Sequence, residues 1–136
     1  MTMKKINFYD TSALLESIGS LKKDEEIMLS SITLEELESI KTANNKDEEI
    51  KYQARRALHF IEENISNISF VIFKEIMLDP IKQIGYAINN DTKIIACAID
   101  ASVSLDITFV TNDLSQMLIA QTFLHSVIMP VVPKEE

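Results

Sequence analysis

Short apolar runs alternate with segments of helical periodicity along nearly the whole chain. The β-prone runs predict strands over residues 4–9, 27–32, 69–73, 107–111 and 126–132. The 3.6-residue period predicts helices over residues 12–18, 33–41, 91–102 and 114–123, and a longer helix after Asp47 with six apolar residues on one face: Ile50, Ala54, Ala57, Leu58, Ile61 and Ile65. Strands that alternate with helices form parallel sheets covered on both faces. We therefore expect an α/β protein with three α/β/α layers and a central parallel sheet of four or five strands.

Helix N-termini are predicted from side chains whose oxygen can accept a hydrogen bond from a free backbone N–H. Ser12 and Asp47 stand at the starts of two predicted helices, and Asp91 opens a third. Thr33 opens another helix, and Glu36 three residues later completes the capping-box pattern.

The two ends of the predicted sheet differ. The apolar run over residues 69–73 predicts a fully buried strand, whereas Pro130 predicts that the last strand lies at an edge. With two glycines and three prolines among 136 residues, nothing in the composition marks a linker. We expect one domain over residues 1–136, because domains usually contain roughly 100–200 residues.

Composition favours a soluble protein of a reducing compartment. Cys97 is the only cysteine, so no internal disulfide can form. No apolar run reaches the roughly 18 residues of a membrane span, and the charged Asp10 interrupts the position of a signal-peptide core. We expect a cytoplasmic location and no membrane partner.

Four carboxylates fall near the predicted C-terminal ends of strands. Asp10 directly follows the first strand, and Glu36 lies in the first turn of the helix after the second. Asp91 begins the helix before the fourth strand, and Asp113 comes two residues after that strand. Ligands of such sheets bind outside the C-terminal ends of the strands, so these four side chains can meet there.

Each carboxylate also has a structural explanation. Asp10 and Asp91 suit helix N-caps, Glu36 suits the capping box, and Asp113 suits a turn. Independent caps have no reason to share a crevice, however, and two carboxylates about 4 Å apart repel by roughly 4 kcal/mol at an effective dielectric near 20. Four of them together require a cation, and oxygen ligands favour Mg²⁺ or Mn²⁺.

A net charge of −8 argues against broad binding to nucleic acid. Without the four candidate site acids the charge is −8 + 4 = −4. Residues 50–61 contain no acid, and four side chains there are candidates for contacting single-stranded RNA, or alternatively form a solvated helix face: Lys51, Tyr52, Arg55 and Arg56. Lys41 and Lys93 lie near site acids in sequence, where they can touch a phosphate or balance charge.

Four segments, in order, resemble motifs of the PIN domain family. They are Asp-Thr-Ser at 10–12, Glu-Glu-Leu at 35–37, Asn-Asp-x-x-Ile-Ile-Ala-x-Ala at 90–98 and Val-Thr-Asn-Asp at 110–113. The second and third are most similar to PIN domains fused to PhoH-type ATPases. The chain ends soon after the last predicted strand, so we expect no ATPase domain.

The resemblance implies a metal-dependent ribonuclease. It implies Asp10, Glu36, Asp91 and Asp113 as the acidic set, with Mg²⁺ or Mn²⁺ held by Asp10, Asp91 and Asp113. Glu36 is then a ligand through water or a group that orients the nucleophile, and the adjacent Glu35 is the competing candidate for the inward-facing carboxylate. Candidate hydrogen-bonding residues that orient these ligands are Thr11, Thr111 and Asn112, and each of the three also suits an ordinary turn.

Two functions remain open at this point. One is an endoribonuclease acting on single-stranded RNA, either in RNA processing or as the toxin of a toxin–antitoxin pair, with an antitoxin partner or a homodimer. The other is a PIN-like module that binds RNA or protein without turnover. Phosphotransfer domains on similar sheets fit poorly, because Ser12 stands where one class requires Asp and residues 1–9 lack the paired acids of another.

Overall fold

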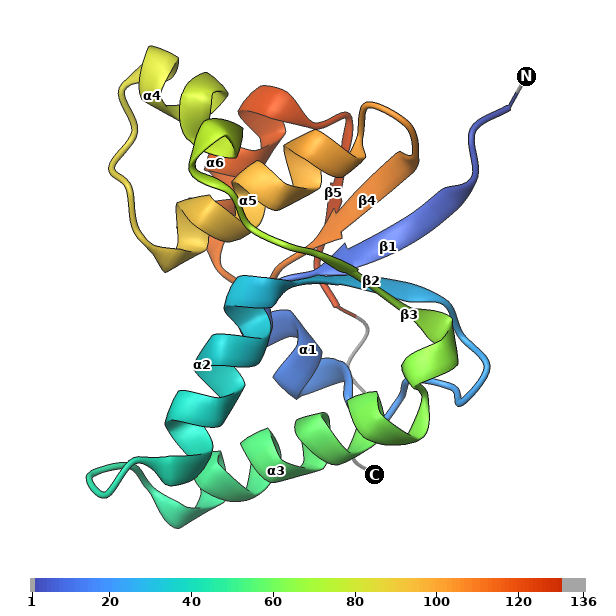
Figure 1. Cartoon of the computed structure of the whole chain (residues 1–136), viewed down its shortest axis with the longest axis vertical. Coiled ribbons are helices and arrows are strands. Elements are labelled where there is room, and N and C mark those ends of the chain that lie inside the picture. The colour runs from blue at the N-terminus through green and yellow to red at the C-terminus, as the bar shows by residue number, and fades with distance from the viewer. Residues whose placement is uncertain (1, 131–136) are drawn as a thin grey trace.

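The computed structural model describes residues 2–130 and confirms the three-layer α/β/α architecture (Figure 1). Five parallel strands form one sheet in the order β3-β2-β1-β4-β5. The strands are β1 (Lys5–Tyr9), β2 (Ile27–Ser30), β3 (Ile68–Val71), β4 (Asp106–Val110) and β5 (Ser126–Ile128). This order places β1 at the centre, so its C-terminal end adjoins those of β2 and β4.

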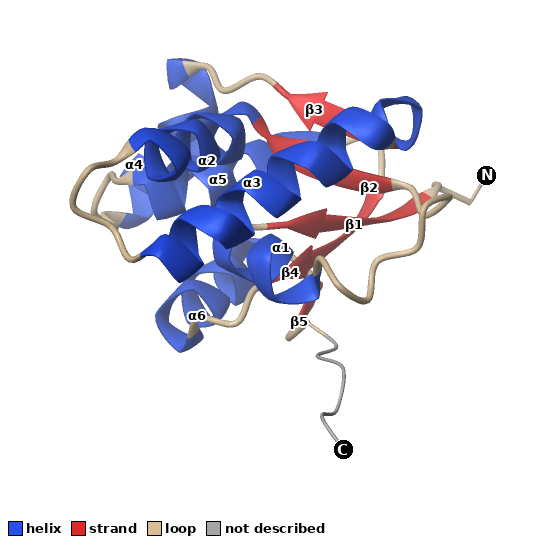
Figure 2. Ribbon diagram, turned by 90° about the horizontal axis from the view of Figure 1, so that it is seen from below, coloured by secondary structure: helices blue, strands red, loops and turns tan. Residues whose placement is uncertain are grey.

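Helices cover both faces of the sheet. On one side lie α1 (Thr11–Ser17), α2 (Ser31–Thr42) and α3 (Glu48–Glu63). On the other lie α4 (Asp79–Ile84), α5 (Asn90–Ala101) and α6 (Leu114–Phe123), as Figures 1 and 2 show. Two short 3₁₀ helices, η1 (Ile65–Asn67) and η2 (Glu75–Leu78), flank β3. No helix in the described part of the chain has the length and apolar character needed to cross a bilayer.

The alternation of side chains along the central strands fills two separate cores. Phe8 of β1 and Phe109 of β4 are fully buried beneath α5, with ring centroids 6.0 Å apart. Tyr9 and Val110, which point to the opposite face, pack with Leu14 of α1. Residues 94–98 of α5 are all shielded from solvent, so this helix contributes much of the core on its face of the sheet.

Three predicted helix starts are wrong. Asp10 caps α1 by accepting a hydrogen bond from the Ala13 amide, which confirms its alternative interpretation as a helix N-cap, whereas the prediction that Ser12 caps this helix is wrong. Ser30 caps α2, so Thr33 lies inside the helix and forms no capping box. The α5 cap is Asn89, whose side-chain oxygen accepts from the Thr92 amide while its backbone N–H donates to the Thr92 hydroxyl.

Because Asn89 is the cap, Asp91 lies in the first turn of α5, and its carboxylate does not cap the helix. The predicted Asp47 cap of α3 is confirmed, by a 2.9 Å bond from the Glu49 amide. Of the expected apolar face of α3, Ile65 lies beyond the helix in η1 and is exposed, as is Ile50.

The sheet edges also differ from expectation. Strand β3 is an edge strand and only Ile68 is fully buried in it, because β2 covers one side and no strand covers the other. The apolar run over 69–73 reflects packing on both faces rather than a central position. Strand β5 is the other edge, as Pro130 predicted, but it ends at Ile128, and residues 131–132 of the expected strand lie outside the described residues. Helix α4 and the 3₁₀ segments were not predicted.

Candidate active site

Asp10 stands at the centre of the C-terminal edge of the sheet. Its backbone N–H donates to the Val110 carbonyl of β4 at 3.1 Å, and the residue is 2% exposed. Carboxylate oxygen Oδ1 accepts a hydrogen bond from the Ala13 amide at 2.8 Å and lies 3.3 Å from the Ser12 hydroxyl. The second oxygen, Oδ2, is buried and has no hydrogen-bond partner. A buried hydrogen-bond acceptor without a partner lowers the stability of the folded state. Oδ2 of Asp10 is such an acceptor, and a bound ligand would satisfy it.

The environment of Asp10 disfavours its charge. Burial raises the pKa of this carboxyl above its ordinary value, and the Asp91 carboxylate raises it further. Interactions with Thr111, Ala13 and Ser12 act in the opposite direction without cancelling the effect of burial. The Thr111 hydroxyl does not provide Oδ2 with a hydrogen bond of acceptable geometry. A cation beside Oδ2 would remove both the burial penalty and the repulsion.

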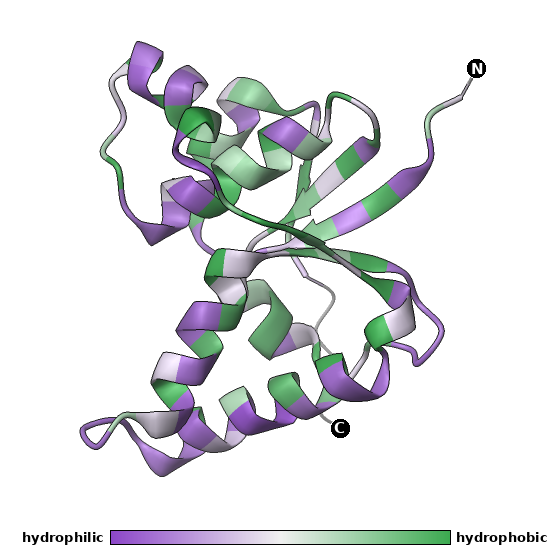
Figure 3. Cartoon of the chain, in the orientation of Figure 1, coloured by the Kyte–Doolittle hydropathy of each residue, from purple (hydrophilic) through white to green (hydrophobic). Residues whose placement is uncertain are grey.

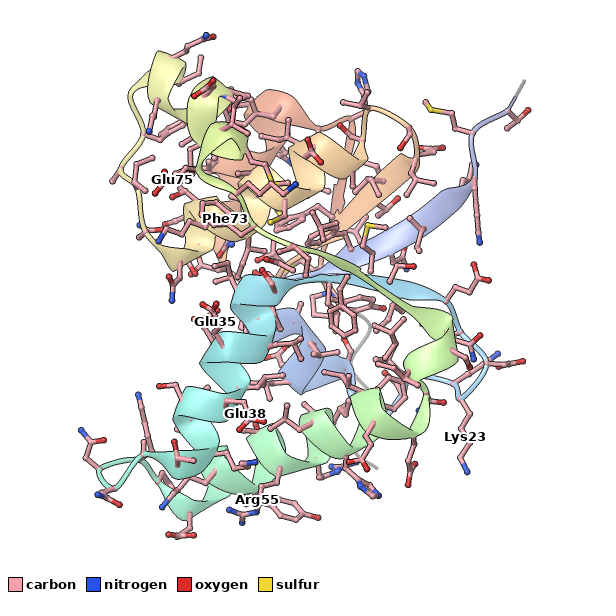
Figure 4. All side chains as sticks on the ribbon, in the orientation of Figure 1. Lys23, Glu35, Glu38, Arg55, Phe73 and Glu75 are labelled. Carbon is pink, nitrogen blue, oxygen red and sulfur yellow. The ribbon has the colours of Figure 1, made fainter. Side chains whose placement is uncertain are left out.

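Glu36 reaches the site from α2. The buried Thr11 hydroxyl donates to Glu36 Oε1 at 2.7 Å and lies 3.1 Å from Thr33 Oγ1. Glu36 is half-buried whereas Glu35 is exposed, and Figure 4 shows Glu35 projecting from α2 on the side away from α1. Because Thr11 follows Asp10 directly, its hydroxyl fixes Glu36, rather than Glu35, beside the Asp10 edge of the sheet.

Asp91 and Asp113 lie at the N-terminal ends of α5 and α6, on the other face of the sheet. Desolvation raises the pKa of Asp91, although the residue as a whole is exposed, and the Asp113 carboxylate raises it further. Asp113 caps α6, with Oδ1 accepting from the Gln116 amide at 3.1 Å, and its own N–H donates to Thr111 Oγ1 at 3.2 Å. The two carboxylates therefore lie within electrostatic range of each other.

Two hydrogen bonds connect segments of the site that are far apart in sequence. The Ser12 hydroxyl donates to Asn112 Oδ1 at 2.6 Å, joining the start of α1 to the loop after β4. The buried Gln116 side chain donates from Nε2 to the Asp91 carbonyl at 3.1 Å, joining α6 to α5. Sequence reasoning missed Gln116, although Gln three residues after an Asp cap is a capping-box pattern that marks the position.

The donor set suits a hard divalent cation. The candidate carboxylates come from the caps of α1 and α6, from α2 and from the first turn of α5; one carboxylate oxygen, Asp10 Oδ2, lacks a hydrogen-bond partner, and two of the carboxyls have raised pKa values. Across residues 2–130, no three Asp, Glu, His or Cys side chains are grouped so that together they could hold a metal ion.

A groove of about 440 Å³ adjoins Glu36 between α2 and the start of α5. Its lining includes Ser39, Lys46 and Asn90 in addition to Glu35 and Glu36. Lys46, in the loop between α2 and α3, is a cation at this groove that the sequence analysis did not single out. Its only sequence signal is its place in the polar break between two helices.

The predicted RNA-contacting residues do not gather at this groove. Lys51 pairs with Glu48 at 3.4 Å, and Arg55 lines a second groove between α2 and α3 together with Lys41. Figure 4 shows Arg55 on the outer side of α3. Tyr52 is half exposed and Arg56 is exposed.

The two lysines near the site acids have other partners. The Lys41 ammonium lies 3.2 Å from a Glu38 carboxylate oxygen. The Lys93 ammonium lies over the Phe73 ring, 5.5 Å from its centroid. An ammonium at this distance is attracted to the ring face. Lys93 is therefore held toward the β3 side of α5.

Comparison with solved structures shows the same fold at low sequence identity. A domain of a functionally unknown protein from Methanocaldococcus jannaschii DSM 2661 matches 98% of this chain and 95% of its own length, with 20% identity and a TM-score of 0.63. FitAcB from Neisseria gonorrhoeae matches 90% of this chain and 96% of the other, with 20% identity and a TM-score of 0.58. VapBC2 from Rickettsia felis, bound to a promoter DNA fragment, matches the same shares with 19% identity and a TM-score of 0.53.

Sequence comparison identifies the family. No curated protein sequence matches the chain. The family model described as "PIN domain" matches residues 8–124, which include all four candidate acids and every strand except β5 and the start of β1. The chain therefore belongs to the PIN domain family.

Proposed function

We propose that this chain is a divalent-metal-dependent endoribonuclease that hydrolyses phosphodiester bonds of single-stranded RNA. The observation that carries the proposal is the buried, unpartnered Oδ2 of Asp10, whose carboxyl has a pKa raised by burial and by Asp91. A structural N-cap needs only Oδ1, so the second oxygen has no role in holding the fold. PIN domains are generally metal-dependent nucleases, which supports the same conclusion.

Asp10, Asp91 and Asp113 are the proposed ligands of Mg²⁺ or Mn²⁺, and Glu36 is the proposed group that orients the nucleophile or binds through water. When bound, the metal would supply a water of lowered pKa and neutralise charge on the phosphate. The remaining contributions come from the chain itself. Ser12 and Ala13 fix one oxygen of Asp10, and Thr11 fixes the carboxylate of Glu36.

Thr111 and Asn112 orient the turn that carries Asp113. Thr111 accepts from the Asp113 amide, and Asn112 accepts from Ser12. These contacts hold the β4 end against the start of α1, so the acids contributed by both segments keep their spacing. Positioning of this kind is worth roughly 10–100-fold in metal affinity or activity.

We propose the groove beside Glu36 as the path of the RNA backbone. Lys46 supplies a positive charge there, and Asn90 supplies an amide. Lys41, Lys51, Tyr52, Arg55, Arg56 and Lys93 are the proposed outer contacts, several of which must first give up an intramolecular partner. With a net charge of −8, the intrinsic affinity for RNA is expected to be weak and to fall with added salt.

An antitoxin is the proposed protein partner. VapBC2 and FitAcB, which share the fold, are toxin–antitoxin complexes, and a toxin of this kind is the finer form of the proposal. We further propose that the chain forms one cytoplasmic domain. We also propose that it is related to the PIN domains fused to PhoH-type ATPases, on the Glu35-Glu36-Leu37 and Asn90-Asp91 segments. RNA processing without an antitoxin is the alternative role.

A PIN-like binding module without turnover is the second candidate. The observation that favours it is that no three Asp, Glu, His or Cys side chains of the described residues are grouped so that they could hold a metal ion. The two candidates are distinguished by one property: only the enzyme cleaves RNA.

The deciding experiment is cleavage of a fluorescently labelled single-stranded RNA in the presence of Mn²⁺, Mg²⁺ or EDTA. We expect cutting by the wild type with either metal, no cutting with EDTA, and loss of cutting in Asp10→Asn. Asp106→Asn is the matched control, because Asp106 lies at the opposite end of β4. Equal residual cutting by wild type and Asp10→Asn would indicate a contaminant and favour the binding module.

A further inference from the structure

Two buried side-chain oxygens in the described part of the chain have no hydrogen-bond partner. One is Asp10 Oδ2, in the proposed metal site. The other is the hydroxyl oxygen of Ser17, the last residue of α1, which is 2% exposed. Native folds seldom leave a buried polar group unpaired, so each such group requires an explanation. The proposed nuclease site does not include Ser17, so this hydroxyl requires an explanation of its own.

Ser17 lines a pocket of about 210 Å³ on the α1 side of the sheet. Tyr9 of β1 and Val110 of β4 line it from the sheet, and both belong to the core that packs with α1. In Figure 1, this is the side of the sheet on which α1, α2 and α3 lie. At about 30 Å³ per water in the liquid, the pocket has room for about seven waters, which is the size of a small organic molecule.

The pocket contains a carboxylate without a cationic partner. Glu25, in the loop between α1 and β2, is half-buried there, and no ion pair of its side chain is found within residues 2–130. The adjacent Glu26, by contrast, is exposed and pairs with Lys4. Lys22 and Lys23 of the same loop are exposed, and Figure 4 shows Lys23 projecting outward. None of the described residues that line the pocket is Lys, Arg or His.

The Tyr9 side chain shows that the Glu25 carboxylate acts on the interior of the pocket. Burial raises the pKa of the Tyr9 hydroxyl, and the Glu25 carboxylate raises it further, whereas Asn7 acts in the opposite direction. Tyr9 is only 7% exposed, so the charge of Glu25 reaches a buried group. A pocket with this charge repels an anion and attracts a cation.

The rest of the pocket is mostly apolar. Leu21, Ile128 and Met129 line it together with Val110. Figure 3 shows the hydrophilic loop between α1 and β2 beside largely hydrophobic strands. A ligand that matches this lining has a positive charge and N–H donors at one end and a short apolar chain at the other.

We propose that this pocket binds a small primary alkylammonium ion. Its ammonium group donates hydrogen bonds to the Glu25 carboxylate and to Ser17 Oγ, with the Asn7 side-chain oxygen as a third acceptor. The alkyl chain packs against Leu21 and Met129. Ser17 and Glu25 then both have partners, which neither has within the described chain.

The site is independent of the proposed nuclease. None of the four candidate acids lines the pocket, and the proposal uses no residue assigned to metal or RNA. Amine binding and RNA cleavage are also measured separately. Loss of cleavage in Asp10→Asn tests the nuclease alone, and the titration below tests the pocket alone.

The test is a titration of the full chain, labelled with ¹³C in its methionine methyl groups, with n-butylammonium at constant ionic strength. We expect the Met129 methyl signal to shift and to saturate at millimolar ligand, as suits so small a molecule. The signals of Met77 and Met117 should stay in place, because η2 and α6 lie on the other side of the sheet.

Three further ligands define what the pocket recognises. Tetramethylammonium has the same charge but no N–H donor, and 1-butanol has the same chain without the charge, so both should shift the Met129 signal much less. An Nα-acetyl-lysine amide carries the same ammonium on a polypeptide backbone. Binding of this amide as tight as that of n-butylammonium would identify a lysine of a partner protein as the source, and weaker binding would identify a free amine.

Variants of the pocket test the two polar contacts. Glu25→Gln should lose the saturable shift, whereas Glu26→Gln removes the same charge from the exposed neighbour and should bind as the wild type does. Ser17→Ala should weaken binding about 10-fold or more, as for other hydrogen bonds to a charged group. Its Tm should not fall, because the hydroxyl that it removes has no partner in the folded chain.

Three results would overturn the proposal. They are a Met129 signal that does not shift saturably with n-butylammonium, an equal shift in Glu25→Gln, and equally tight binding of tetramethylammonium or 1-butanol. The first would show that the pocket holds only water, and the other two would show that neither the carboxylate nor the N–H donors select the ligand.

Discussion

The Gln116 side chain donates a hydrogen bond from Nε2 to the backbone carbonyl of Asp91, across 25 positions of sequence, at 3.1 Å. The backbone amide of Gln116 donates at the same time to Asp113 Oδ1. One buried residue thus contacts the segments that carry two of the four acids. The separation of Asp91 and Asp113 is set by a side chain that carries no charge.

Gln116→Met should weaken metal binding without unfolding the protein. Methionine fills a similar volume but cannot donate to the Asp91 carbonyl, so the start of α5 loses its tie to α6. We expect the apparent affinity for Mn²⁺ to fall about 10-fold or more, as for other residues that orient metal ligands. Titration calorimetry measures this directly. Gln121→Met, on the exposed face of the same helix, should bind Mn²⁺ as the wild type does.

Thr11→Val should impair turnover more than stability. The substitution removes the donor to Glu36 Oε1 and frees that carboxylate from its position beside Asp10. A hydrogen bond to a charged group contributes about 1.5–3 kcal/mol to the free energy of unfolding. The contribution is smaller here, because Glu36 is half-buried and water can replace the Thr11 hydroxyl. We expect kcat to fall about 10-fold or more with a smaller change in KM, measured on the labelled RNA. Thr42→Val, which removes an exposed hydroxyl from the end of α2, should leave both constants unchanged.

Asp10→Asn should stabilise the metal-free protein at neutral pH while abolishing activity. The raised pKa of Asp10 means that the folded state holds a proton more tightly than the unfolded state. The contribution of Asp10 to the free energy of unfolding is therefore most favourable below the ordinary carboxyl pKa. It declines as pH rises through the higher pKa of the folded state. Asparagine is never charged and can still accept the Ala13 hydrogen bond that caps α1. In EDTA, the Tm of the variant should exceed that of the wild type by a few degrees at neutral pH, and the two should converge in acid.

Added Mn²⁺ should reverse that order. The metal binds the folded wild type and not the unfolded chain. It therefore raises the free energy of unfolding of the wild type by about 2.7 kcal/mol when the free Mn²⁺ concentration is a hundredfold above Kd. Asp10→Asn should gain much less. An equal rise in Tm for both proteins would show that Mn²⁺ binds elsewhere.

Ser30→Ala should cost more stability than loss of an ordinary helix cap. Ser30 is fully buried, and its hydroxyl accepts from the Ile32 amide at 3.0 Å and donates to the Cys97 sulfur at 3.3 Å. Removing it leaves a buried N–H unsatisfied, at a cost of about 1–3 kcal/mol in the free energy of unfolding. Asp47→Ala removes an exposed cap whose N–H water can reach, so about 1 kcal/mol or less is expected. Urea denaturation compares the two, and equal losses would contradict the role of burial.

Local patterns in the sequence were sufficient for the fold class and for the order of the elements. Apolar alternation located Ile6 and Phe8 of β1, and helical periodicity located the α3 face around Ala54 and Ala57, because both signals depend only on nearby residues. The Asp47 cap followed from the same local chemistry. Three other predicted caps lie two or three residues from the observed ones, since several nearby side chains could accept the same backbone N–H and only the path of the chain selects one.

The placement of the acids near strand ends was also visible in the sequence, because parallel strands share one functional edge. The sequence left open whether Glu35 or Glu36 turns inward, and it gave no sign that Asp10 Oδ2 lacks a partner or that Gln116 joins two helices. These properties depend on contacts between residues 22 to 100 positions apart, such as Thr11 with Glu36 and Ser12 with Asn112. The edge position of β3 was decided in the same way: residues 69–73 are apolar in either place, and only the strand order of the tertiary structure determines whether a neighbour covers them.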